Sequence, residues 1–367
     1  MKPIPSRTIT TAALAAAAWM IFSGGLPAAD KADTDPKHQL PTPDARAADM
    51  TKPVKVFILM GQSNMFGMGD VGPVEKMGTL EYLTRTEKRY PHLLDDAGVW
   101  TARSDVRHVQ VMPGKKGGGM STPHNEWLTV KGKSMGPEIQ FGYIMGQVLD
   151  EPVLLLKSCI GNRSLGWDLL PPGSERFVVD GKTYAGYKDT PDSWVEGEPK
   201  KAVDWYAGKQ YDDDVANAKA VLAKLGDHYP GATKYEIAGF VWWQGHKDQN
   251  PVHASRYEQN LTRLIHSLRK DFDAPNAKFV LATGCGNPGR TGFGLQIAEA
   301  QLAVGDAKKH PEFAGHVKCV DSRDFWREAE VSPNPKQGYH YYRNAETYME
   351  VGNALGWAMA ELLGKAK

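Results

Sequence analysis

An apolar run that ends in a small polar turn constrains the fold of this chain more than any other feature. The run is Val54-Lys-Val-Phe-Ile-Leu-Met60, and the turn that follows it is Gly61-Gln-Ser-Asn64. A short, partly β-branched run closed by glycine is typical of a buried strand in an α/β sheet. Ligands of open α/β sheets bind beyond the carboxyl ends of the strands. Ser63 therefore stands where a nucleophile would be placed; the alternative is that it only caps a following helix.

Later segments repeat this pattern and alternate with stretches of helical spacing. The expected strands are 153–158, 237–243, 279–283 and 317–321. The expected helices are 137–149, 215–225, 256–271, 295–308 and 345–363. Strands that alternate with helices predict an α/β fold in which helices cover both faces of a parallel sheet.

Two long insertions, 70–133 and 169–212, interrupt the alternation. Loops of this length in a compact domain are usually functional or disordered. Aromatic side chains in and beside the second insertion allow two interpretations, a rim on which a sugar stacks or a small core of the loop itself. These residues are Tyr184, Tyr187, Trp194 and Trp205.

The N-terminus has the features of a secretory signal peptide. Lys2 and Arg7 precede an apolar stretch at 11–22, and small residues follow at 24–29. An apolar core of about a dozen residues is shorter than the roughly 20 that a spanning helix needs, although an uncleaved anchor is the alternative. We expect a signal peptide at 1–29, a linker at 30–52 and one domain at 53–367. The product would be secreted or periplasmic, with no stable membrane insertion after cleavage.

Composition excludes several other functions. The chain has 367 residues and a net charge of +1, so no strong field indicates a nucleic-acid partner. Its three cysteines, Cys159, Cys285 and Cys319, show no zinc-binding spacing and leave a possible disulfide unassigned. Neither His-Glu-x-x-His nor a phosphate-binding glycine motif occurs. We therefore expect no metal and no cofactor.

Residues suited to acyl transfer follow the ends of successive predicted strands. The reaction needs a nucleophile, a base that takes its proton, and donors for the oxyanion. Ser63 follows the first strand, and Gly161 follows the second, where it presents a backbone N–H that no side chain screens. Gln244 follows the third strand, where its amide is a possible donor. His340 precedes the final helix and is the candidate base.

At this point the chain resembles the SGNH hydrolase superfamily, and more closely the sialate O-acetylesterase-like carbohydrate esterases. The resemblance covers roughly 53–365. It is carried by Gly61-Gln-Ser-Asn64, by Trp243-Gln-Gly245, and by the His340 loop with the following Asn344-Ala-Glu-Thr-Tyr348. Ser134-Met-Gly-Pro-Glu138 is a weaker match.

The resemblance implies a flavodoxin-like three-layer α/β/α sandwich with Ser63 as nucleophile and His340 as general base. The oxyanion hole would consist of the N–H groups of Ser63 and Gly161 and the side chain of Gln244. The implied activity is removal of O-acetyl groups from a carbohydrate by an exported serine esterase. Two alternatives remain, an esterase of the same fold that acts on another acyl ester and a catalytically weak carbohydrate-binding protein.

One position departs from the family pattern. Members often have Asp three residues before the catalytic histidine, and here that residue is Gln337. A glutamine can orient an imidazole but cannot stabilise its cation as a charge would. We expect Asp321, which closes the last predicted strand, to support His340. The other possibilities are no third residue at all, or one of Asp324, Glu346 and Gln337.

Overall fold

The computed structural model describes residues 46–114, 119–284 and 286–366. All described helices and strands belong to the unit Leu40–Lys367. The predicted signal peptide at 1–29 and most of the predicted linker lie outside the described residues, as does Cys285. Cys159 and Cys319 are free thiols.

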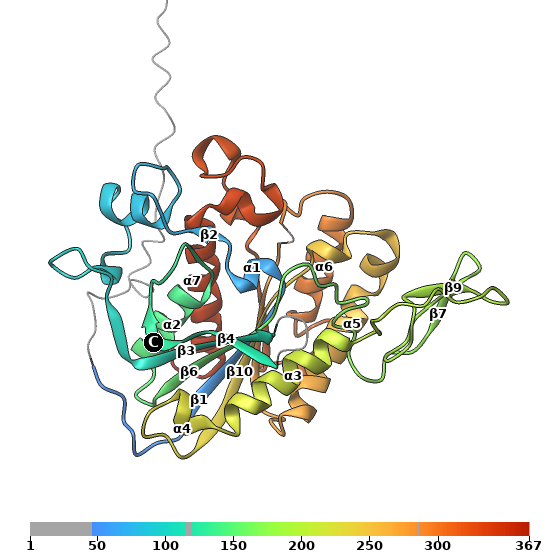
Figure 1. The fold of residues 1–367 in the computed structure, drawn as a ribbon, viewed down its shortest axis with the longest axis horizontal. Coiled ribbons are helices and arrows are strands. Elements are labelled where there is room, and N and C mark those ends of the chain that lie inside the picture. The colour runs from blue at the N-terminus through green and yellow to red at the C-terminus, as the bar shows by residue number, and fades with distance from the viewer. Residues whose placement is uncertain (1–45, 115–118, 285, 367) are drawn as a thin grey trace, which may run out of the picture. The chain divides into compact units, whose positions relative to one another are not determined.

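A seven-stranded sheet forms the centre of the fold (Figure 1). In spatial order its strands are β12 (Val317–Val320), β11 (Lys278–Ala282), β10 (Tyr235–Trp243), β1 (Val54–Gly61), β6 (Val153–Ser158), β3 (Ala102–Pro113) and β4 (Met120–Thr129). Every neighbouring pair is parallel except β3 and β4, which are antiparallel. The five strands expected from the sequence are all present, and β1 lies between β10 and β6.

Helices cover both faces of the sheet (Figure 1). One apolar core holds residues of α2 (Glu138–Val148) and α7 (Ala345–Leu362). The other holds residues of α3 (Lys209–Leu222), α5 (Pro251–Asp271) and α6 (Gly292–Val304). The five expected helices are therefore confirmed, and the architecture is the expected three-layer α/β/α sandwich.

Strand β1 shows why its sequence is apolar without alternation. Val56, Ile58 and Met60 belong to the core that contains α3, α5 and α6. Phe57 and Leu59 belong to the opposite core, with α2 and α7. Because successive side chains point to opposite faces and both faces are covered, each position must be apolar.

The first insertion is partly sheet. It contains β3 and β4, and also the strand β2 (Gly69–Asp70), which pairs with β5 (Ser134–Met135). Buried polar residues, among them Arg103, Asp105 and His108, occupy β3 and conceal the strand from a hydrophobicity-based prediction. Its short helical turns are η2 (Tyr82–Thr86) and η3 (Pro91–Leu93).

The second insertion forms a small antiparallel sheet of its own, β7 (Phe177–Val179), β8 (Lys182–Tyr184) and β9 (Ser193–Val195). Trp194 is only 6% exposed and packs with Leu170, Ala185 and Ala207. This packing supports the interpretation that Trp194 forms a small core of the loop.

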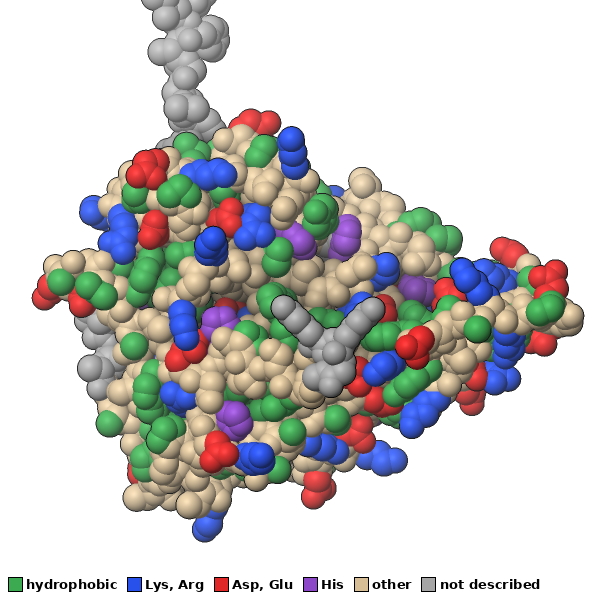
Figure 2. All heavy atoms as spheres, viewed as in Figure 1, with side chains coloured by type: hydrophobic (Ala, Val, Ile, Leu, Met, Phe, Trp, Pro, Cys, Tyr) green, Lys and Arg blue, Asp and Glu red, His purple; other side chains and the backbone are tan. Residues whose placement is uncertain are grey.

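The remaining short elements are α1 (Ser63–Phe66), α4 (Leu225–His228), η4 (His246–Asp248), η5 (Pro311–Phe313), η6 (Arg323–Phe325), η7 (Ala329–Val331) and η8 (Gly338–Arg343). Figure 2 shows basic and acidic side chains interspersed over the visible face, as the small net charge predicts. Among the described residues, no helix combines the length and apolar character needed to cross a bilayer.

Candidate active site

Ser63 follows β1 in a turn that requires glycine. Gly61 has a φ of +154°, and a Cβ atom on it would lie 2.3 Å from the carbonyl oxygen of Trp243 at the end of β10. Gln62 is the N-cap of α1, and Ser63 is the first residue of that helix. Because Gln62 and not Ser63 occupies the capping position, the alternative that Ser63 only caps the helix is not supported.

Gly161 lies directly beside Ser63. A Cβ atom placed on Gly161 would lie 3.5 Å from the Cβ of Ser63. Neither the N–H of Ser63 nor that of Gly161 donates a hydrogen bond to another described residue. Two backbone donors without a protein acceptor beside a serine side chain are the arrangement that an oxyanion hole requires.

The loop that carries His340 has an unusual backbone. Tyr341, Tyr342 and Arg343 have φ values of 52°, 52° and 62°, in the left-handed region that side chains disfavour. Tyr341 is buried, and its ring stacks on that of Trp243 with centroids 5.3 Å apart. Such strained backbone tends to occur at functional sites and persists because the surrounding packing enforces it.

Asn64 joins the nucleophile helix to the His340 loop. Its Nδ2 donates to the carbonyl oxygen of Tyr339 at 3.4 Å. The hydroxyl of Tyr348, on α7, lies 2.9 Å from Oδ1 of Asn64 and 3.2 Å from the carbonyl oxygen of His340. Residues far apart in the sequence, Ser63 and His340, are therefore held in neighbouring segments.

The half-buried imidazole of His340 has Gln337 as its partner. His340 Nδ1 lies 3.2 Å from Oε1 of Gln337. An amide oxygen can only accept, so Nδ1 carries the proton and Nε2 keeps a free lone pair. Burial lowers the pKa of His340 to about 4, and the nearby positive charge of Arg343 and the neighbouring His246 contribute in the same direction.

The expectation that Asp321 supports His340 is wrong. Its carboxylate accepts from Nε of Arg323 at 2.8 Å and from the hydroxyl of Thr283 at 3.1 Å. The other two acids considered are also paired with arginines: Asp324 binds Arg290, and Glu346 binds Arg89 and Arg327. Of the positions left open by the sequence, Gln337 is the one that contacts the imidazole.

Gln244 lies at the end of β10, as expected, but its amide is committed to protein acceptors. It is 1% exposed, and its Nε2 donates to the Arg163 carbonyl at 2.9 Å and to Asp248 at 2.6 Å. Oε1 of Gln62 lies 3.2 Å from the same nitrogen. In this arrangement Gln244 holds the loop after β6, and its direct donation to an oxyanion stays a prediction.

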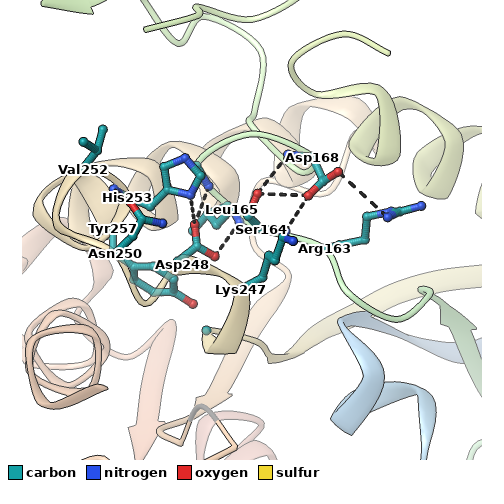
Figure 3. A network of polar contacts seen from close by, with 12 residues as sticks. Arg163, Ser164, Leu165, Asp168, Lys247, Asp248, Asn250, Val252, His253 and Tyr257 are labelled. Carbon is teal, nitrogen blue, oxygen red and sulfur yellow. Dashed lines mark hydrogen bonds and ion pairs between the residues drawn. The ribbon is translucent and has the colours of Figure 1, made fainter. Parts of the chain in front are cut away.

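Asp248 forms the centre of a buried network that sequence reasoning missed (Figure 3). The carboxylate is 0% exposed and accepts from the N–H groups of Leu165 and Gly166 at 2.8 and 2.7 Å. His253 Nδ1 lies 3.2 Å from it. The network fixes the loop that carries Gly161 against the turn after β10. The sequence feature that could have indicated this network is an acidic residue four positions after Gln244.

Comparison with known families agrees with this geometry. Residues 53–360 match the family described as "Carbohydrate esterase, sialic acid-specific acetylesterase". The chain belongs to this carbohydrate esterase family. It is therefore a carboxylic ester hydrolase of the carbohydrate acetylesterase type. A search of curated protein sequences finds no match.

Solved structures similar to this carbohydrate esterase include a protein from Arabidopsis thaliana, at 18% identity and a TM-score of 0.48, with 84% of this chain and 99% of that chain covered. NanS shows 12% identity and a TM-score of 0.44, with 87% and 98% covered. A carbohydrate acetylesterase from Xanthomonas citri shows 11% identity and a TM-score of 0.43, with 84% of this chain and 56% of that chain covered.

In this carbohydrate esterase the predicted site residues all lie at one edge of the sheet. Ser63, Gly161 and Gln244 follow the carboxyl ends of β1, β6 and β10, which are adjacent strands. His340 comes from the loop before α7, which is fastened to this edge through Asn64. The edge thus combines a serine, a neutral imidazole and two backbone N–H donors.

Proposed function

We propose that this chain is an exported serine esterase that removes O-acetyl groups from a carbohydrate related to sialic acid. Ser63 is the nucleophile and His340 the general base. The observation that carries the proposal is the contact of Ser63 with Gly161 at the edge of the sheet, with the His340 loop tied to the same turn. The description of the family supports the substrate class.

Acylation begins when Oγ of Ser63 attacks the acetyl carbonyl carbon and His340 Nε2 takes the hydroxyl proton. The carbonyl oxygen becomes an oxyanion, which the N–H groups of Ser63 and Gly161 stabilise. When the tetrahedral intermediate collapses, the bond to the sugar oxygen breaks. His340 returns its proton to that oxygen, and the acetyl group stays on Ser63.

Deacylation repeats these steps with water. His340 takes a proton from a water molecule, the hydroxide attacks the acetyl-serine, and acetate leaves as Ser63 regains its proton. Gln337 keeps the proton of His340 on Nδ1 throughout. Because Gln337 is neutral, it orients the ring without stabilising the imidazolium.

Substrate class is tested by comparing acetate release from O-acetylated sialic acid and from acetylated xylan, each with wild-type enzyme and Ser63→Ala. The p-nitrophenyl esters of acetate and octanoate test the acyl pocket. Ser63-dependent turnover of the sialic acid ester and of the short acyl ester supports the proposal. Preference for octanoate or for xylan would indicate that the enzyme acts on a different ester.

A catalytically weak carbohydrate-binding protein is the second candidate, favoured by Gln337 in the place of a carboxylate. Folded enzyme that binds sialic acid but turns over none of the four esters would support this candidate. Orienting groups contribute only part of the rate in triad enzymes, so we expect measurable turnover.

Export is supported by the basic, apolar and small-residue segments at the N-terminus. The proposed location is secreted or periplasmic, with cleavage near Ala29–Asp30. The mass of the exported product tests this point, because an intact N-terminus would contradict it.

A further inference from the structure

Four polar side chains gather on one face of the β3–β4 pair. His108 is paired with Glu126 across the two strands, and Gln110 is paired with His124. Because both sets are two residues apart on their strand, all four point to the same face of the sheet. Neither β3 nor β4 was predicted from the sequence, so the sequence did not place His108 beside His124.

Two of these groups are buried without a hydrogen-bond partner among the described residues. His108 is 4% exposed and Gln110 is 2% exposed, and Nε2 of each is unpartnered. A buried polar group without a hydrogen-bond partner destabilises the folded state. Both side chains line a small cavity of about 40 Å³, which His124 lines as well. A ligand in this cavity would satisfy both groups.

The donor atoms are those that a transition metal takes. One ligand atom from each of His108, His124 and Glu126 lies within 4.8 Å of the others. We propose that these three residues bind a divalent transition metal ion, with Zn²⁺ the best chemical match. Two imidazoles and a carboxylate are a familiar zinc set, and a water completes its four-coordination. The amide N–H of Gln110 would donate to that water.

The two lysines nearby are already neutralised. Lys131 Nζ lies 2.9 Å from Glu126, and its side chain is 58% exposed, so it can move into water when a metal arrives. Lys157 is fully buried and paired with Glu138 at 2.5 Å.

The cavity also borders α1, the helix that begins at Ser63. Phe66 and Gly67, at the end of α1, line it together with the two histidines. None of the three proposed ligands belongs to the Ser63–His340 machinery. The metal site therefore stands independently of the proposed esterase mechanism, and its role would be to stiffen the support of α1.

Zinc binding is tested with the full chain, purified without an affinity tag, treated with a chelator and titrated with ZnCl₂ by calorimetry. We expect one equivalent to bind with micromolar or tighter affinity and to raise the unfolding temperature. His124→Gln and Glu126→Gln should each weaken binding about tenfold or more. Both residues are partly exposed, so we expect these variants to fold. Buried His108 is left unchanged for the same reason.

His310→Gln is the matched control. Its imidazole also lies between two carboxylates, those of Glu258 and Glu312, at 3.0 and 2.9 Å, but on the surface. This variant should bind zinc as the wild type does. Cobalt added in place of zinc should give the visible absorption of a four- or five-coordinate site, and this signal should be absent from His124→Gln. The proposal is overturned if no equivalent binds, or if binding is the same in His124→Gln and in the control.

Discussion

Nδ1 of His340 lies 3.2 Å from the amide oxygen of Gln337, three residues earlier in the chain. The amide fixes which nitrogen of the ring carries the proton, and so leaves Nε2 free to take a proton from Ser63. It supplies no charge, and Arg343 opposes protonation further. The enzyme therefore has an oriented but weakly basic histidine.

The pH dependence of the reaction should reflect this environment. His340 acts as a base only when neutral, and its pKa of about 4 keeps it neutral above that pH. The value of kcat/KM for p-nitrophenyl acetate should therefore hold down to about pH 4 and fall about tenfold per unit below it. Tryptophan fluorescence at each pH controls for unfolding. An acid limb near the ordinary histidine value would contradict this prediction.

A carboxylate at position 337 should change both the pH profile and the rate. Gln337→Glu keeps the length of the side chain and places a negative charge beside His340. Opposite charge raises the pKa of an imidazole, so the acid limb of kcat/KM should move to higher pH. We expect kcat at neutral pH to rise about tenfold, or roughly 1.4 kcal/mol.

Asp321→Asn is the control for this change, because Asp321 is bound to Arg323. It should leave the acid limb and kcat unchanged. If Asp321→Asn lowers kcat strongly and Gln337→Glu does nothing, the partner of His340 during catalysis is not Gln337.

Removing the nucleophile should abolish activity without unfolding the protein. The Ser63 hydroxyl makes no hydrogen bond to another described residue. Ser63→Ala should therefore change the free energy of unfolding by less than about 0.5 kcal/mol, while turnover falls by roughly 10³-fold or more. Ser255→Ala, on the exposed side of α5, should keep full activity. Near wild-type turnover by Ser63→Ala would overturn the assignment of the nucleophile.

A single methyl group at Gly161 should separate catalysis from stability. The structure leaves room for it, since the new Cβ would lie 3.5 Å from Ser63 in ordinary contact. The methyl would partly screen the N–H that faces the oxyanion, so Gly161→Ala should lower kcat about 10- to 100-fold. Gly226→Ala, where the added Cβ also fits, should leave kcat unchanged. Equal kcat in both variants would exclude Gly161 from the oxyanion hole.

Gln244→Ala should affect folding and catalysis together. It removes one of the donors to buried Asp248 and the side-chain oxygen that accepts from the Tyr257 hydroxyl. We expect a loss of about 2 kcal/mol in the free energy of unfolding and a fall in kcat of roughly 10²–10³-fold. Urea unfolding and steady-state kinetics measure the two effects. Lower kcat with unchanged stability would favour direct donation to the oxyanion, and a change confined to KM would indicate substrate binding.

Local pattern predicted the framework of this protein. A strand buried on both faces must be apolar throughout, which is why 54–60 could be recognised as a buried strand and Ser63 placed at its end. The helices were recognised because their buried residues recur with helical spacing, as in α5. Backbone position at a strand end is a local property, so the predicted places of Gly161 and Gln244 also agree with the structure.

What each side chain bonds to was decided by tertiary structure alone. Asp321 and Gln337 were both reasonable partners for His340 in the sequence, and only the arrangement of Arg323 and the η8 turn distinguishes them. In the same way, only the tertiary structure shows that the amide nitrogen of Gln244 donates to Asp248 and to the Arg163 carbonyl. β3 stayed hidden because buried polar residues alternate with its buried valines. The pairing of β3 with β4 brings His108 and His124 together. Hydrogen bonds depend on distances of a few tenths of an ångström between segments far apart in the chain, and local sequence carries no record of those distances.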